Sequence, residues 1–180
     1  MPGADRYNNV AILLHWSIAV LVILNLVIGL GHDALPRAWG VMPIHKAIGI
    51  TVLFLSVVRL GWRLAHTPPP FVATTRAWER ALASTVHWLF YVLLIVVPLT
   101  GWLMVSGTET RRPLTFFGLF DIPYLPVGIA AGDFGHESHE VLGLLMAALV
   151  ILHIGAALLH QFVKRDVTLS RMFPPAKQGG

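Results

Sequence analysis

The 180-residue sequence predicts an all-α membrane protein, a single domain built as a bundle of four transmembrane helices. Hydrophobic residues make up 56% of the chain and charged residues only 12%, whereas a soluble domain carries about 25% charged residues. Four apolar stretches each match the roughly 20 residues of helix that a bilayer core requires. Because the hydrocarbon offers backbone groups no hydrogen-bond partner, we expect each stretch to be helical.

The expected helices cover residues of about 10–30, 44–64, 83–105 and 137–163. Each is bounded by shorter polar or Gly/Pro-rich segments, as helices that end at a membrane surface require. The third loop, from Ser106 to about Gly135, contains the segment FFGLFDIPYLP. We expect this amphipathic segment to lie along the membrane interface.

The lysines and arginines predict how the bundle is oriented. On the side of the two tails and the second loop, the basic residues are Arg6, Arg63, Arg76, Arg80, Lys164, Arg165, Arg171 and Lys177. On the other side they are Arg37, Lys46, Arg111 and Arg112. Because cytoplasmic loops carry the excess of basic residues, we expect both termini in the cytoplasm. Positions beside apolar runs also explain the net charge of +4 without nucleic acid as a partner.

Four of the nine histidines lie inside the expected spans or at their mouths, at depths that match in pairs. His139 and His153 are fourteen residues apart on the fourth helix. That spacing is a rise of about 21 Å with an angular drift of about 40°, so both side chains lie on one face. His45 begins the second helix at the level of His139, and His15 lies on the first at the level of His153. Since ionisable residues inside a membrane mark function, the sequence predicts two sites stacked across the bilayer.

A pair of imidazoles at each level favours b-type haem as the ligand. Cysteine is absent, which excludes disulfides, iron–sulfur clusters and covalently attached haem. Two imidazoles on opposite faces of a porphyrin complete the coordination of its iron, which suits electron transfer. Zinc would need three or four ligands at one level. Histidines that only hydrogen-bond between helices are the alternative, and four of them at matched depths favour two haems.

Arg59 and Arg63 follow His45 by fourteen and eighteen residues, so they lie near the inner pair on about the same helix face. The propionates of a haem need charged partners, and the guanidinium fork of arginine matches a carboxylate. The alternative is that both side chains extend to the cytoplasmic interface. Propionate contact is the better explanation for the deeper Arg59, and both explanations stay open for Arg63.

His87 and His160 lie toward the cytoplasmic interface, and neither pair requires them. They are candidates for contact with a quinone carbonyl, or for polar residues anchored at the interface. His87 is also an alternative to His15 as the partner of His153. We prefer His15 because the first helix has no other reason to carry a buried histidine.

Several short motifs together resemble one known family. They are HW at 15–16, IHKAIG at 44–49, RLGWR at 59–63, PLTG at 98–101, HE at 139–140, LH at 152–153 and RMFP at 171–174. From about Tyr7 to Pro174 the chain resembles the bacterial cytochrome b561 family, and RMFP is similar to its small stand-alone members. The resemblance implies a multi-pass protein of the bacterial inner membrane with two b haems and ubiquinone as redox partner. It also implies His45 and His139 as ligands of the outer haem, and His15 and His153 as ligands of the inner haem.

The resemblance implies an oxidoreductase, most specifically a superoxide:ubiquinone oxidoreductase that oxidises superoxide outside the membrane and passes the electron to ubiquinone. No catalytic residue is predicted beyond the groups that bind the cofactors. An anionic substrate favours an electropositive approach, but the outer side carries six acidic residues against four basic ones. A local cluster of Lys46, Arg111 and Arg112 beside the outer haem would be needed to attract superoxide.

Two alternatives stay open at this point. One is a cytochrome b membrane-anchor subunit that passes electrons between quinone and a periplasmic oxidoreductase. The cytochrome b subunits of formate dehydrogenase and hydrogenase are similar, with two ligands fourteen residues apart on one helix. The other is a non-redox transporter or scaffold that uses the histidines for protons or a metal ion. Transporter helices are usually broken at mid-membrane, and here only Pro98 interrupts a span, which favours electron transfer.

Overall fold

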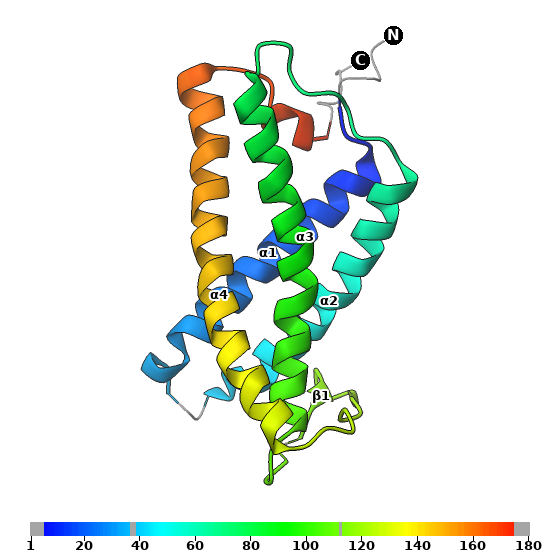
Figure 1. Cartoon of the computed structure of the whole chain (residues 1–180), viewed down its shortest axis with the longest axis vertical. Helices are drawn as coiled ribbons and strands as arrows, with labels where there is room; N and C mark the ends of the chain where they lie inside the picture. The colour runs from blue at the N-terminus through cyan, green and yellow to red at the C-terminus, as the bar shows by residue number, and fades with distance from the viewer. Residues whose placement is uncertain (1–5, 37–38, 112, 175–180) are drawn as a thin grey trace.

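Four long helices account for most of the computed structural model, which describes residues 6–36, 39–111 and 113–174 (Figure 1). They are α1 (Asn9–Gly31), α2 (Val41–Ala65), α3 (Ala77–Ser106) and α4 (Ile129–Leu158). All four are long and apolar enough to cross a membrane. The predicted bundle of four transmembrane helices is confirmed.

Two of the helices, α3 and α4, begin six or more residues earlier than the sequence predicted. α3 begins at Ala77 and not near residue 83, because a carboxylate oxygen of Glu79 accepts a hydrogen bond of 3.0 Å from the backbone N–H of Arg76 and closes its first turn. α4 begins at Ile129, eight residues before the predicted 137. The apolar run marks only the part of a helix inside lipid, and both of these helices continue beyond it.

Short elements complete the chain at the two ends of the bundle. A one-turn 3-10 helix, η1 (His32–Ala34), follows α1. A π-helical turn, η3 (Leu159–Lys164), continues α4, and a second 3-10 turn, η4 (Ser170–Met172), comes near the C-terminus. The third loop contains the strands β1 (Thr115–Phe116) and β2 (Phe120–Asp121), which pair antiparallel as a small hairpin.

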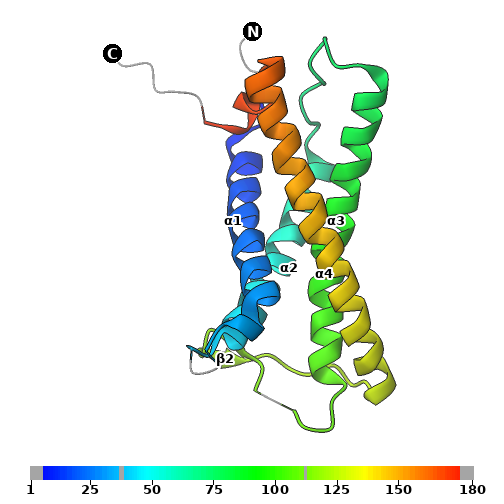
Figure 2. The same cartoon turned by 90° about the vertical axis from the view of Figure 1, so that its left-hand side faces the viewer.

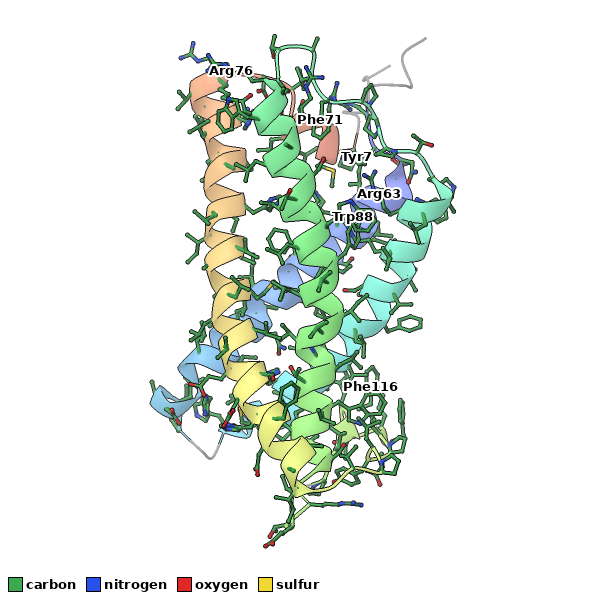
Figure 3. All side chains as sticks on the ribbon, in the orientation of Figure 1. Tyr7, Arg63, Phe71, Arg76, Trp88 and Phe116 are labelled. Atoms are coloured by element: carbon green, nitrogen blue, oxygen red, sulfur yellow. The ribbon has the colours of Figure 1, made fainter. Side chains whose placement is uncertain are left out.

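Both ends of the described chain lie at one end of the bundle (Figure 2). The backbone N–H of Tyr7 donates to the carbonyl oxygen of Arg171 over 3.4 Å. The second loop lies at this same end, which we call the inner end, and the first and third loops lie at the opposite, outer end. Figure 3 labels Tyr7, Arg63, Phe71, Arg76 and Trp88 toward the inner end and Phe116 toward the outer end.

The helices pack as two antiparallel pairs. α1 packs along α2 and α3 packs along α4, whereas α1 and α4 touch at few points. The α3–α4 contact depends on glycines: a Cβ added to Gly135 would lie 2.7 Å from the backbone nitrogen of Met104. The same is true of Gly107 and Gly132, whose backbones meet directly. Small residues of this kind let two membrane helices approach closely.

A central core joins the two pairs. Its buried side chains come from all four helices and are Ile18, Val22, Ile48, Val52, Leu93, Leu94, Met146 and Leu149. The outward faces are apolar as well: Val27 is 65% exposed and Ile151 71%. Exposed apolar surface on every span is what a lipid-facing bundle requires.

Candidate functional site

The outer pair of histidines, His45 on α2 and His139 on α4, lies across the gap between the two helix pairs. Their ring centroids are 6.0 Å apart, with an angle of 88° between the ring planes. Nδ1 of His45 lies 3.2 Å from the backbone carbonyl oxygen of Asn25, and Nδ1 of His139 lies 2.9 Å from that of Val97. Because a carbonyl oxygen can only accept, each Nδ1 carries the proton, and each Nε2 keeps its lone pair for a metal.

Each ring of the outer pair also lies against a glycine of a neighbouring helix. A Cβ added to Gly29 on α1 would lie 2.9 Å from Cε1 of His45. A Cβ added to Gly101 on α3 would lie 3.0 Å from both Cε1 and Nδ1 of His139. Each imidazole therefore packs against a glycine backbone on one side, and its Nδ1 is held by a backbone carbonyl oxygen.

The inner cluster holds three histidines and not two. His153 on α4 lies 6.3 Å from His15 on α1 and 5.9 Å from His87 on α3, measured between ring centroids. Phe90 packs edge-on against His153 at 5.3 Å. The predicted His15–His153 pair is brought together, and so is the alternative pair of His87 with His153. Distance alone does not choose between them.

The two arginines of α2 lie near this cluster in different environments. Nη1 of Arg59 reaches the carbonyl oxygen of Ala11 at 3.5 Å, and its guanidinium lies 5.9 Å from the ring centroid of Tyr91. Nη1 of Arg63 is buried and has no hydrogen-bond partner among the described residues. A buried guanidinium N–H without an acceptor is costly, so this atom is suited to bind an anionic group.

His160 lies in η3, beyond the inner cluster, and its contacts are with the C-terminal segment. Its Nδ1 lies 2.5 Å from Oδ2 of Asp166 and 3.4 Å from the hydroxyl of Thr168. Sequence reasoning missed Asp166, because a histidine and an aspartate six residues apart form no recognisable motif. They meet because the π-helical turn is followed by Arg165 in the left-handed conformation, with φ of 53°.

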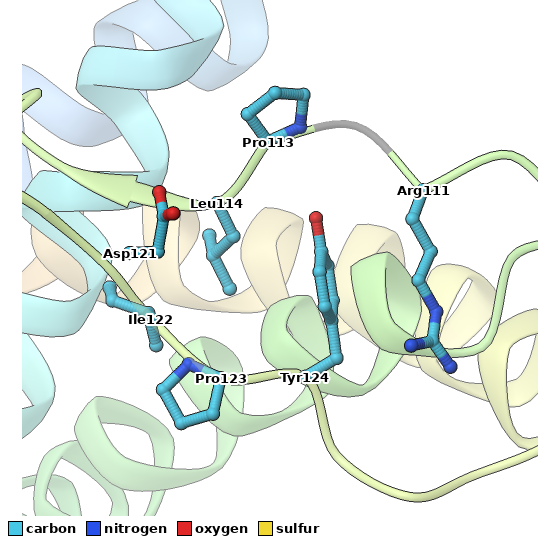
Figure 4. A pocket seen from close by; sticks show the side chains of 7 residues that line it. All are labelled: Arg111, Pro113, Leu114, Asp121, Ile122, Pro123 and Tyr124. Carbon is cyan, nitrogen blue, oxygen red and sulfur yellow. The ribbon is translucent and has the colours of Figure 1, made fainter.

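The third loop covers the outer end of the bundle and forms a pocket of about 520 Å³ (Figure 4). Its lining consists of Arg111, Pro113, Leu114, Asp121, Ile122, Pro123 and Tyr124. The ammonium of Lys46 donates to the carbonyl oxygen of Pro113 over 3.1 Å, and the indole of Trp102 donates to that of Pro123 over 3.0 Å. Lys46 follows His45 and Trp102 follows Gly101, so these bonds fasten the loop beside the outer pair.

Each described cation that was expected to attract an anion has contacts of its own in the third loop. The guanidinium of Arg111 lies 5.0 Å from the ring centroid of Tyr124, with the carboxylate of Asp121 in the same pocket. Lys46 is held by a carbonyl oxygen. Arg112, the third expected member, lies outside the described residues.

Comparison with known proteins decides the family. The family model described as prokaryotic cytochrome b561 matches residues 6–175. The chain belongs to the prokaryotic cytochrome b561 family. It is 31% identical over 173 residues to "Cytochrome b561 homolog 2" of Escherichia coli (strain K12), covering 93% of this chain and 91% of that protein.

Other relatives of this cytochrome b561 have more varied names. It is 30% identical over 174 residues to "Probable superoxide oxidase CybB" of Yersinia pestis, covering 94% of this chain and 96% of that protein. It is 28% identical over 186 residues to "Cytochrome b562" of Cereibacter sphaeroides, covering 97% and 99%. The family and the four spans make the chain a multi-pass protein of the bacterial inner membrane that transfers electrons with b-type haem.

The residues of this cytochrome b561 fit b-type haem on three observations. Two imidazoles bound to one metal through bonds of about 2 Å place their ring centres roughly 6 Å apart, as the histidine centroids are in both layers. In the outer layer, the Nδ1 contacts leave both Nε2 atoms available. In the inner layer, Nη1 of Arg63 has no hydrogen-bond partner among the described residues and would suit a haem propionate.

Proposed function

We propose that this cytochrome b561 holds two b haems, one in each histidine layer, and transfers electrons across the membrane from superoxide to ubiquinone. The single observation that carries the proposal is the stack of two facing histidine pairs, 6.0 and 6.3 Å between centroids, built on one face of α4. We place the inner end in the cytoplasm, because the tails and the second loop carry the excess of basic residues.

His45 and His139 are the proposed ligands of the outer haem. Their carbonyl partners fix the tautomer, and the neighbouring glycines leave the imidazoles room without allowing them to turn. Bound between such imidazoles, haem supplies reversible one-electron chemistry with no open coordination position. The chain itself orients the ligands, excludes water and sets the electrostatic environment.

We assign the inner haem to His15 and His153 in preference to His87 and His153. α3 packs along α4, whereas α1 and α4 touch at few points, so a planar group fits more readily between α1 and α4. The outer pair likewise takes one histidine from each helix pair. His87 is then left beside the inner haem as a donor to a quinone carbonyl. Arg63, and Arg59 one turn deeper along α2, are the proposed partners of the inner propionates.

Superoxide is proposed as the electron donor because the relative from Yersinia pestis, whose length this chain matches, is named a probable superoxide oxidase. The third loop supports an approach from the outer side, since Lys46 lies next to His45 and at the edge of the pocket. A periplasmic protein is the alternative donor, and the experiment below separates the two.

The test is a spectrum and a turnover measurement on the purified protein. We expect b-type bands, two haems per chain, and reduction of ubiquinone when superoxide is generated in the assay. His45→Ala or His139→Ala should remove one haem and keep the other. Absence of haem bands would refute electron transfer as a whole. Two haems that superoxide fails to reduce, but that a periplasmic protein reduces, would refute only the donor.

A further inference from the structure

We propose that His160, positioned by Asp166, donates the proton that ubiquinone takes up when it is reduced at the inner end. This inference rests on the proposed function, because it assigns a role in quinone reduction to two residues beside the inner cluster. Here His160 would contact the quinone, and Asp166 is a positioning residue that acts through His160.

The carboxylate of Asp166 orients the imidazole of His160 and lies where it can stabilise a positive charge on that ring. Oδ2 of Asp166 lies 2.5 Å from Nδ1 of His160, and Oδ1 accepts a hydrogen bond of 2.9 Å from the backbone N–H of Thr168. The backbone N–H of Asp166 also donates to the carbonyl oxygen of His160 over 3.2 Å. The side chains are only 20% and 16% exposed, so this is not a solvated surface ion pair. With Nδ1 bound to the carboxylate, Nε2 is the atom left to act on another molecule.

The depth of His160 suits this role. An ion pair of 2.6 Å between Lys164 and Glu79 aligns the end of η3 with the start of α3. From that level, His87 lies eight residues along α3, about 12 Å deeper, and His153 lies eleven residues back along α4, about 16 Å deeper. His160 is four residues back from Lys164, about one turn deep. It therefore lies between the aqueous end and the level of His87, where a quinone headgroup beside the inner haem would present a carbonyl oxygen.

The chemistry balances with the electrons that the proposed function supplies. Two superoxide anions lose one electron each and become two molecules of oxygen, while ubiquinone gains two electrons and two protons and becomes ubiquinol. His160 as imidazolium breaks its Nε2–H bond, and the proton forms an O–H bond on the reduced carbonyl. The carboxylate of Asp166 stabilises the positive charge on the ring before transfer. The second proton of ubiquinol comes from water at the inner surface, and the ring of His160 takes its own new proton from the same water.

The carboxylate is ionised when it is needed. Burial raises the pKa of Asp166, but hydrogen bonds from Thr168 and His160 outweigh burial and hold this pKa below its ordinary value. Other charged or titratable groups stand at this end of the bundle on the neighbouring elements, and among the described residues they are Arg6, Tyr7, His15, Arg59, Arg63, His66, Arg76, Glu79, Arg80, His87, His153, Lys164, Arg165 and Arg171. The bonds to His160 distinguish Asp166 from the only other carboxylate among them, Glu79, which pairs with Lys164.

The experiment separates haem reduction from haem reoxidation by rapid mixing of the intact protein in detergent. Asp166→Asn should leave the haem spectrum and the reduction of the haems by superoxide unchanged. Reoxidation by ubiquinone should slow by about 10² at neutral pH, within the range that a general acid contributes. As pH rises, the reoxidation rate of Asp166→Asn should also begin to fall at a lower pH than that of the wild type. Asp166→Glu should restore part of the reoxidation rate. A purely structural role would not move the pH profile.

His66→Gln is the matched control. His66 is a histidine in the loop region at the inner end, stacked on Trp62 at 3.8 Å, and it takes no part in the pair. Its substitution should leave reoxidation at the wild-type rate, while His160→Gln should slow reoxidation as Asp166→Asn does. If Asp166→Asn loses haem, His160→Gln still provides the test.

The outcomes distinguish the two proposals. A wild-type protein whose haems are not reoxidised by ubiquinone refutes the proposed function. A wild-type protein that reduces ubiquinone, with His160→Gln and Asp166→Asn at the same rate and with the same pH profile, overturns the inference about this pair alone.

Discussion

Replacing Gly101 by alanine should selectively weaken the outer haem. The new Cβ would lie 3.0 Å from Cε1 and Nδ1 of His139, whereas ordinary contacts begin near 3.4 Å. The ring cannot retreat freely, since its Nδ1 is held 2.9 Å from the carbonyl oxygen of Val97 on the same helix as Gly101. Overpacking of this kind costs about 1–3 kcal/mol. That cost corresponds to a loss of roughly 5- to 150-fold in haem affinity.

The assay is the haem-to-protein ratio of the purified variant, followed by a potentiometric titration of the haem bands. We expect the ratio to move from two toward one and the transition of one haem to shrink, with the other unchanged. Gly143→Ala is the matched control on α4, because a Cβ at this glycine meets nothing within 4 Å. If Gly101→Ala retains both haems at wild-type affinity, the proposal that His139, packed against Gly101, is a ligand of the outer haem is refuted.

Three further predictions concern the inner end. His15→Ala should lower the haem-to-protein ratio from two to one, whereas His87→Ala should keep both haems and impair quinone turnover; the reverse result would make His87 the ligand. Arg63→Met should lower the midpoint potential of the inner haem, because a nearby cation favours the reduced form. The expected drop is roughly 60 mV for each 1.4 kcal/mol of lost interaction. An unchanged potential in a redox titration would show that Arg63 does not bind the propionates. The lowered pKa of Asp166 means that its contribution to stability is present above the ordinary carboxyl pKa and lost as pH falls through the lowered value. Asp166→Asn should therefore reduce the melting temperature at neutral pH, with the difference shrinking toward acid pH, and a constant difference at all pH values would contradict this.

The parts of the structure that depend on helical periodicity could be predicted from the sequence. The fourteen-residue spacing of His139 and His153 placed both on one face, and the matched depths of His45 and His15 placed a partner opposite each. Depth along a helix follows from counting residues, because the rise per residue is constant. The same counting left both His15 and His87 as candidate partners of His153 at the inner haem, and in the structure both lie beside His153.

Features that depend on tertiary approach could not be predicted. The packing role of Gly29 and Gly101 could not be predicted, since it comes from an imidazole ring that a different helix presents to each glycine. Asp166 meets His160 only through an irregular turn and a left-handed residue. The hairpin of the third loop was expected only as an interfacial segment, because its strands have two residues each and show no alternation to read.

The division of the bundle into two helix pairs has a consequence for how the protein responds to loss of haem. α3 and α4 meet through bare glycine backbones, so this pair can associate in lipid without help. α1 and α4 share few contacts, and on the proposed assignment the imidazoles of His15 and His153, with the haem between them, would add to the contacts that the central core provides. Without haem, the α2–α3 contact and the central core would still join the two halves, so loss of the cofactor should loosen the bundle first where α1 faces α4.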